Sequence, residues 1–246
     1  DSAELFIGGV HIQQYYFYND EDGKASFEHF LALYRNRKDM KIEDKGNYII
    51  ISSRINGRVA MVYANKPDKE VGIDEIAAVL KEGNLSPQVV VHRGHSYYAD
   101  STIRRLTPLA AIVFLGSCGG YANIATVLEK SPKAHIISTK GTGTMYVNDN
   151  LLRLLLNRIL RGENIVWQTF WDDAERQFAD KDFEKYVPPD KNLVAIYLNA
   201  YHNMMNASNA KSAAKMKELG SRVPLDEDYE MDLQSRHEEF EKLAAS

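Results

Sequence analysis

The sequence predicts an α/β domain built on a mostly parallel central sheet. Two apolar runs, QVVVHRGH (88–95) and LAAIVFLGSC (109–118), are continuous rather than alternating, as in strands that helices cover on both faces. Segments with helical spacing stand between the expected strands, and this alternation is typical of parallel sheets. The length of 246 residues suffices for one such domain with an appendage.

The N-terminal part is expected to add a strand, a hairpin and two helices. VHIQQYYFY (10–18), rich in β-branched and aromatic residues, predicts a strand that ends in the loop NDEDG. Apolar residues at helical spacing predict helices over 24–36 and 72–84. The dipeptide NG at 56–57 predicts the turn of a hairpin over 47–65, because it readily takes positive φ angles.

The alternation of strands and helices continues towards the C-terminus. The expected elements are a short crossover helix over 100–106, a helix over 121–131, a strand over 134–139, a helix over 148–164 ended by Gly162, and a helical segment over 166–186. Trp167, Phe170, Trp171 and Phe178 have helical spacing within the last segment, which predicts that they lie in the core. KNLVAIYLNA (191–200) is compatible with a final strand or a surface segment.

The chain is expected to divide into a domain over 1–205 and a polar, helical extension over 206–246. The extension is rich in Ala, Lys, Glu and Ser, and it is too polar to build a core unaided. We therefore expect it to dock on the domain, to bind a partner or to cover a cleft.

Composition excludes several functional classes. The net charge of -4 gives no large basic surface, so nucleic acid is not an expected partner. No apolar run is long enough to span a bilayer, so no membrane association is expected and the domain should be soluble. Because the chain begins at Asp1, we expect a processed product, which leaves its compartment open and is compatible with a secreted or periplasmic origin.

The lone cysteine, Cys118, excludes an internal disulfide and a CxxC metal site. It lies in GSCGG, directly after one apolar run, while His95 ends the other run. Because ligands collect at the carboxyl ends of parallel strands, we expect the thiol and the imidazole to face each other there. A thiol beside an imidazolium and a helix start is favoured as a thiolate, which is the form that attacks carbonyl groups.

The order of these motifs resembles a known family. An apolar run ending in Gly-His, followed by one ending in a small residue, Cys and Gly-Gly, is similar to the clan CD cysteine peptidases, which include caspases, gingipains, clostripain, legumain and separase. The likeness is greatest to the gingipain-like and CHAT-type branches and covers roughly residues 7–170. It implies a caspase-like three-layer α/β/α sandwich.

The resemblance also implies a function and roles for individual residues. The chain would be a cysteine endopeptidase that acts on a protein or peptide through a catalytic dyad of His95 and Cys118, without a cofactor or metal. Backbone N–H groups of Cys118 and of Ser96, which stands where the family usually has Gly, would bind the oxyanion. Asp149 would line the substrate-binding pocket and favour a basic side chain, or alternatively cap a helix.

Other interpretations remain open at this point. The same fold could serve as an inactive module that binds a peptide or partner. GSCGG also fits G-x-C-x-G, the nucleophile turn of α/β-hydrolases and amidotransferases, for which His202 is the best downstream partner and His135 and His237 are poorly placed. His92 is a rival to His95 as the catalytic histidine. No recognisable calcium-binding motif is present in the sequence.

Overall fold

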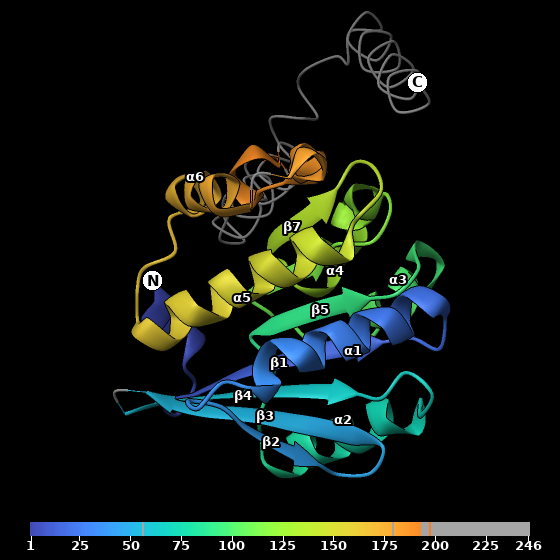
Figure 1. Cartoon of the computed structure of the whole chain (residues 1–246), viewed down its shortest axis with the longest axis vertical. Helices are drawn as coiled ribbons and strands as arrows, with labels where there is room; N and C mark the ends of the chain where they lie inside the picture. The colour runs from blue at the N-terminus through green and yellow to red at the C-terminus, as the bar shows by residue number, and fades with distance from the viewer. Residues whose placement is uncertain (56, 179, 193–196, 198–246) are drawn as a thin grey trace, which may run out of the picture. The chain divides into compact units, whose positions relative to one another are not determined.

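The computed structural model describes residues 1–55, 57–178, 180–192 and 197. Within this part of the chain, one mixed sheet has the strand order β2-β3-β4-β1-β5-β6-β7-β8 (Figure 1). The central strands β4, β1, β5, β6 and β7 run parallel, while β2, β3 and β8 pair antiparallel. The protein is thus an α/β fold with a mostly parallel sheet, as the sequence predicts.

The strands are short to medium in length. They are β1 (Val10–Phe17), β2 (Lys41–Asp44), β3 (Tyr48–Ile55), β4 (Arg58–Asn65), β5 (Val89–Arg93), β6 (Ile112–Leu115), β7 (His135–Thr139) and β8 (Tyr186–Val187). All five residues of β5 and all four of β6 are buried, which confirms that the two apolar runs lie inside the sheet.

Six α-helices connect the strands in the described part of the chain. They are α1 (Glu21–Arg35), α2 (Val71–Glu82), α3 (Ala99–Ile103), α4 (Ile124–Lys130), α5 (Met145–Arg161) and α6 (Trp167–Phe178). Short 3-10 turns include η2 (Ser96–Tyr98), η3 (Gly120–Asn123) and η4 (Lys181–Lys185). Asp20 caps α1 by accepting the N–H of Gly23 at 2.6 Å, and Gly162, with φ of 71°, ends α5.

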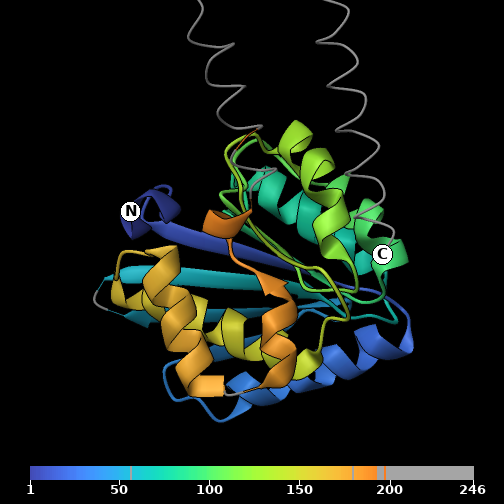
Figure 2. The same cartoon turned by 90° about the horizontal axis from the view of Figure 1, so that it is seen from above.

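Helices cover both faces of the sheet (Figure 2). On one face, α1, α5 and α6 pack on aromatic and aliphatic side chains of β1 and its neighbours. On the other face, α3 and α4 cover β5, β6 and β7, while α2 covers β3 and β4. The aromatic set Trp167, Phe170, Trp171 and Phe178 is buried in the first of these layers, which confirms its predicted core position.

Several expected elements match closely. The predicted hairpin pairs Ile55 with Arg58, and Gly57 has φ of 77°, as a tight turn requires. The helix predicted over 72–84 lies at 71–82, and the strand predicted over 134–139 lies at 135–139. No helix in the described ranges has the length and apolar character needed to cross a bilayer.

Other elements differ from expectation for local reasons. The helix predicted over 166–186 ends at Phe178, and the chain then forms η4 and the edge strand β8. The edge strand β2, which carries Lys41 and Glu43, contains no apolar run from which a strand could be predicted. The segment 191–200 falls mostly outside the described residues, and the predicted extension 206–246 and His202 and His237 fall wholly outside them.

Candidate functional site

The two predicted dyad residues line one small pocket at the carboxyl ends of β5 and β6. These strands are parallel neighbours, with Val89 paired to Ile112 and His92 to Leu115, so both end at the same edge of the sheet. A pocket of about 130 Å³ opens there and is lined by His95 and Cys118 together with other residues from the strand ends, α1 and α5. The topology thus brings the thiol and the imidazole to one concave site.

His95 is held by two carboxylates from the start of α1. Its backbone N–H donates to Oδ2 of Asp20 at 3.2 Å, and its Nδ1 lies 3.2 Å from Oδ2 of Asp22. Its ring stacks on Tyr97 with 5.2 Å between centroids. Because Nδ1 is engaged by Asp22, Nε2 is left as the nitrogen that can exchange a proton with a ligand.

The turn before His95 depends on a glycine. Gly94 has φ of 145°, and a Cβ there would lie 3.0 Å from Oδ2 of Asp20 and 3.2 Å from Cβ of Tyr18. A side chain at this position would therefore disturb both the backbone conformation and the carboxylate that holds His95.

Cys118 is exposed in a turn that hydrogen bonds fix from behind. The N–H of Gly120 donates to Ser117 O at 3.2 Å and to Oγ1 of Thr139 at 3.3 Å, and Thr139 Oγ1 itself donates to Ser117 O. The N–H of Gly119, which has φ of 65°, donates to Gly141 O at 3.0 Å. These hydrogen bonds hold the backbone on either side of Cys118, while the cysteine itself is exposed to solvent.

The backbone N–H groups of Ser96 and Cys118, the predicted oxyanion donors, have no hydrogen-bond acceptor among the described residues. Ser96 begins η2 directly after His95, and Cys118 lies inside the pocket lining. Two unused N–H groups beside a thiol are the donors that a developing oxyanion needs.

His92, the rival histidine, has a supporting position. Its side chain is 1% exposed, with Nδ1 2.8 Å from Oγ1 of Thr102 and Nε2 3.1 Å from the carbonyl oxygen of His95. Burial lowers the pKa of His92 to about 4. Both ring nitrogens of His92 have hydrogen-bond partners, and the contact of Nε2 with the carbonyl oxygen of His95 supports the backbone at that residue.

The position of Asp149 differs from both roles expected of it. Its side chain is 2% exposed, pairs with Arg93 and His29, and does not line the pocket. It also does not cap α5, because the helix begins earlier and Thr144 accepts the N–H of Val147 at its start. The pairing with Arg93 at the end of β5 holds the carboxylate inside the protein, and no local sequence pattern indicates this pairing.

A polar relay joins α5 to the strand that precedes Cys118. The hydroxyl of Tyr186 donates to Oδ1 of Asn148 at 2.9 Å, and Nδ2 of Asn148 donates to Gly116 O at 3.1 Å. A Cβ on Gly143 would lie 1.7 Å from the same carbonyl oxygen, so only glycine fits there. The loop before α5 therefore packs directly against the cysteine turn.

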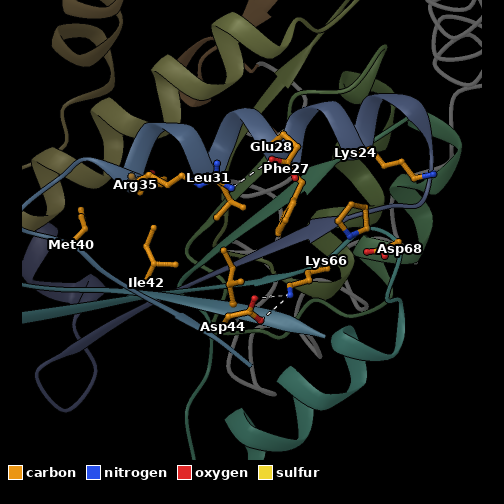
Figure 3. A pocket seen from close by; sticks show the side chains of 13 residues that line it. Lys24, Phe27, Glu28, Leu31, Arg35, Met40, Ile42, Asp44, Lys66 and Asp68 are labelled. Atoms are coloured by element: carbon orange, nitrogen blue, oxygen red, sulfur yellow. Dashed lines mark hydrogen bonds and ion pairs between the residues drawn. The ribbon is translucent and has the colours of Figure 1, made fainter. Parts of the chain in front are cut away.

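A larger pocket lies elsewhere, between α1 and the strands β2 and β3 (Figure 3). Its volume is about 840 Å³, and apolar Phe27, Leu31 and Ile42 line it together with paired charges such as Lys66 and Asp44. Its lining includes neither a cysteine nor a histidine. The smaller pocket, which holds His95 and Cys118, is therefore the candidate functional site.

The nucleophile-turn interpretation of GSCGG has less structural support. Such a turn strains the nucleophile backbone, yet Asn84 is the only non-glycine residue in the described ranges with positive φ. His135 begins β7 and accepts a hydrogen bond from Trp167 at 3.0 Å, so it lies at the amino ends of the strands, away from Cys118. His202 and His237 lie outside the described residues.

Sequence reasoning missed Asp20, Asp22, Arg93 and Asn148 as residues of the site. The acidic pair follows β1 directly, so the rule that placed His95 at a carboxyl edge could also have placed these carboxylates there. No comparable sequence pattern indicated that Arg93 or Asn148 would lie at the site. Among the described residues, no group of three or more His, Cys, Asp or Glu side chains is arranged to hold a metal ion.

Comparison with known proteins yielded no match to a family model, a curated protein or a solved structure.

Proposed function

We propose that the chain is a cysteine peptidase with a caspase-like fold, in which Cys118 is the nucleophile and His95 the proton-transfer group. The observation that supports this most directly is the shared pocket of His95 and Cys118 at the ends of adjacent parallel strands. A parallel sheet core with helices on both faces is compatible with the caspase-like sandwich.

In the first step, the Cys118 thiolate attacks the carbonyl carbon of a peptide bond. The carbonyl oxygen becomes negative and accepts hydrogen bonds from the N–H groups of Cys118 and Ser96. The C–N bond then breaks as protonated His95 gives its Nε2 proton to the leaving nitrogen. An amine departs and a thioester remains on Cys118.

In the second step, water hydrolyses the thioester. His95 takes a proton from the water as the oxygen attacks the acyl carbon, and the C–S bond breaks to restore the thiolate and the imidazolium. Asp22, whose Oδ2 lies 3.2 Å from Nδ1 of His95, orients the ring throughout both steps.

The direct test uses a peptide acyloxymethyl ketone, which alkylates an activated thiolate. Mass spectrometry should locate the label on Cys118, and Cys118→Ala should prevent both labelling and hydrolysis of a mixed fluorogenic peptide library. His95→Ala should abolish hydrolysis and strongly slow labelling.

His135→Gln is the matched control, because this histidine lies at the opposite edge of the sheet and should leave both readings unchanged. Iodoacetamide in denaturant checks that the thiol is present and reduced. A thiol that reacts only after denaturation would contradict the proposed peptidase and favour a non-catalytic binding module, and so would hydrolysis that survives Cys118→Ala.

A further inference from the structure

Strand β2 leaves one edge of the sheet unpaired in the described part of the chain. It pairs with β3 alone and stands at the end of the strand order. The N–H of Lys45 donates to Tyr48 O at 2.9 Å, so the backbone groups of Lys45 face β3. Because this direction alternates along an antiparallel pair, Glu43 also faces β3, whereas the N–H and C=O groups of Ile42 and Asp44 point outwards. These outward groups form the outer edge of β2, to which a further strand can bond.

Both faces of the sheet are hollowed beside β2. On the α1 side lies the groove of about 840 Å³, which has Ile42 and Asp44 in its lining (Figure 3). On the opposite, α2 side, a pocket of about 430 Å³ is lined by Lys41 and Arg54 together with Met61, which packs on the α2 layer. Because the side chains of a strand alternate between the two faces, a strand added to β2 places side chains in both hollows.

The α1-side groove is apolar and carries no net charge. Its apolar lining includes Phe27, Leu31, Met40, Ile42 and Ile49. Two of its carboxylates are paired within the lining, Glu28 with Arg35 and Asp44 with Lys66. The two other charged residues of the lining, Lys24 and Asp68, have opposite signs. This side of the edge therefore suits apolar side chains.

The α2-side pocket is basic. Its lining contains three cations, Lys38, Lys41 and Arg54. Asp39 is the one carboxylate of that lining, and Arg37 neutralises it through a hydrogen bond of 3.0 Å from Nε. Side chains that enter this hollow therefore meet a surplus of positive charge, which favours acidic residues.

The charges of β2 itself restrict the strands that can pair with it. Lysines on an edge strand normally prevent unwanted pairing, because an incoming strand has to cover them. Lys41 and Lys45 both lie 2.9 Å from Glu43, so one carboxylate is shared by two ammonium groups. An acidic strand supplies the missing negative charge, whereas a basic or wholly apolar strand does not.

We propose that the outer edge of β2 binds an extended segment of a partner protein in which apolar and acidic residues alternate. The partner's backbone bonds to Ile42 and Asp44, and its apolar side chains lie in the α1-side groove. Its acidic side chains face Lys41 and Arg54 in the α2-side pocket. Three strands separate β2 from β5, so this surface is distinct from the proposed catalytic pocket and does not depend on the peptidase.

The test follows the backbone amides of the ¹⁵N-labelled Cys118→Ala protein, which cannot cleave the probe, by nuclear magnetic resonance. The probe is an acetylated octapeptide amide in which valine and glutamate alternate. At millimolar concentration it should shift the amide signals of Ile42 and Asp44 and slow their exchange with deuterated solvent. Lys41 and Glu43, which already bond to β3, should keep their exchange rates. Shifts confined to the catalytic pocket, or no shifts, would overturn the proposal.

Two related peptides separate the contribution of charge from that of the backbone. Replacing every glutamate by lysine should weaken binding about tenfold or more, because the lysines then meet like charges. N-methylation of every backbone nitrogen, which keeps the side chains but removes the donors, should abolish binding. Equal affinity for the lysine peptide, or binding that survives N-methylation, contradicts strand addition by an acidic partner.

Variants then assign the binding to the edge. Ile42→Pro removes one outward N–H, which an edge strand tolerates, and should abolish binding, whereas Ile42→Val should retain it. Lys41→Glu combined with Arg54→Glu changes only exposed side chains and should reverse the preference towards the lysine peptide, even if Ile42→Pro fails to fold. An unchanged preference in this double variant rules the proposal out. Arg105→Glu combined with Lys130→Glu, two exposed cations near α3 and α4, is the matched control and should bind as before.

Analytical ultracentrifugation without peptide distinguishes a partner protein from a second copy of the chain. The protein should sediment as a monomer. A dimer that Ile42→Pro dissociates would assign the edge to self-association and overturn the proposal.

Discussion

Nδ1 of His95 lies 3.2 Å from Oδ2 of Asp22, so the first turn of α1 and the end of β5 meet at the proposed catalytic imidazole. The two side chains are far apart in sequence and both are partly exposed, at 43% and 64%. The carboxylate orients the ring, yet solvent weakens its electrostatic effect. Because the Asp22 carboxylate orients the ring but is exposed to solvent, removing it is expected to have only a modest effect on catalysis.

Asp22→Asn should lower kcat/KM by about two- to fivefold, the scale of an exposed ion pair, with little change in the unfolding transition. Glu21→Gln, a neighbouring acid in the same helical turn, is the control. Steady-state kinetics on a peptide substrate gives the answer. An unchanged kcat/KM would show that Asp22 does not position His95, and a thousandfold loss would place it among the essential groups.

Asp149→Ala should destabilise the fold by about 3 to 5 kcal/mol, because it leaves the Arg93 guanidinium buried without its counter-ion. Arg93→Met combined with Asp149→Leu should recover most of that loss, since no unpaired charge remains. Urea unfolding followed by circular dichroism measures both. Asp100→Ala, which breaks the exposed pair with Arg104, should cost no more than about 1 kcal/mol. Equal losses for Asp149→Ala and Asp100→Ala would refute the assignment of a buried pair.

Gly143→Ala should impair both stability and activity, because its Cβ would lie 1.7 Å from Gly116 O in the strand end that leads to Cys118. Overpacking of this kind costs about 1 to 3 kcal/mol. Gly141→Ala serves as the control in the same loop, since its Cβ meets only the flexible Lys185 side chain, at 3.4 Å. Thermal unfolding and the rate of Cys118 labelling should change for the first variant alone.

Stability should decrease as the pH falls from about 6.5 towards 4. Burial lowers the pKa of His11 and of His92 to about 4, below the ordinary value of 6.5. Between pH 6.5 and 4 these two histidines become protonated in the unfolded chain but stay neutral in the folded protein. Each histidine therefore contributes to the free energy of unfolding above pH 6.5, and this contribution is lost as the pH falls towards 4. The loss is roughly 3 kcal/mol per histidine at most.

Urea unfolding at pH 7, 5.5 and 4.5 measures this dependence, in a range above most of the carboxylate titrations. His11→Gln, far from the pocket, should flatten the curve without affecting catalysis. A stability that stays constant between pH 7 and 4.5 would contradict the burial of these neutral imidazoles.

The central strands could be predicted because their signal is local. Val89–Val91 and Ile112–Leu115 are unbroken apolar segments, and an apolar strand between helices has few alternatives to the middle of a sheet. The edge strands β2 and β8 could not be predicted from the sequence. Each is a segment of only two to four residues of mixed polarity, and such a segment becomes a strand only when it pairs with the free edge of a neighbouring strand. The early start of α5 depended on the Thr144 cap, which is weaker than the later NDN signal.

Periodicity and chain order were enough to predict the α/β alternation and to place His95 and Cys118 after two buried strands. The contact of Asp22 with His95, and the pairing of Asp149 with Arg93 away from the pocket, arise only when the chain is folded. Contacts between side chains 56 or more positions apart depend on register and packing, which no local pattern records. Whether Arg93 or Asp149 lines the pocket was therefore decided by the packing of the folded chain.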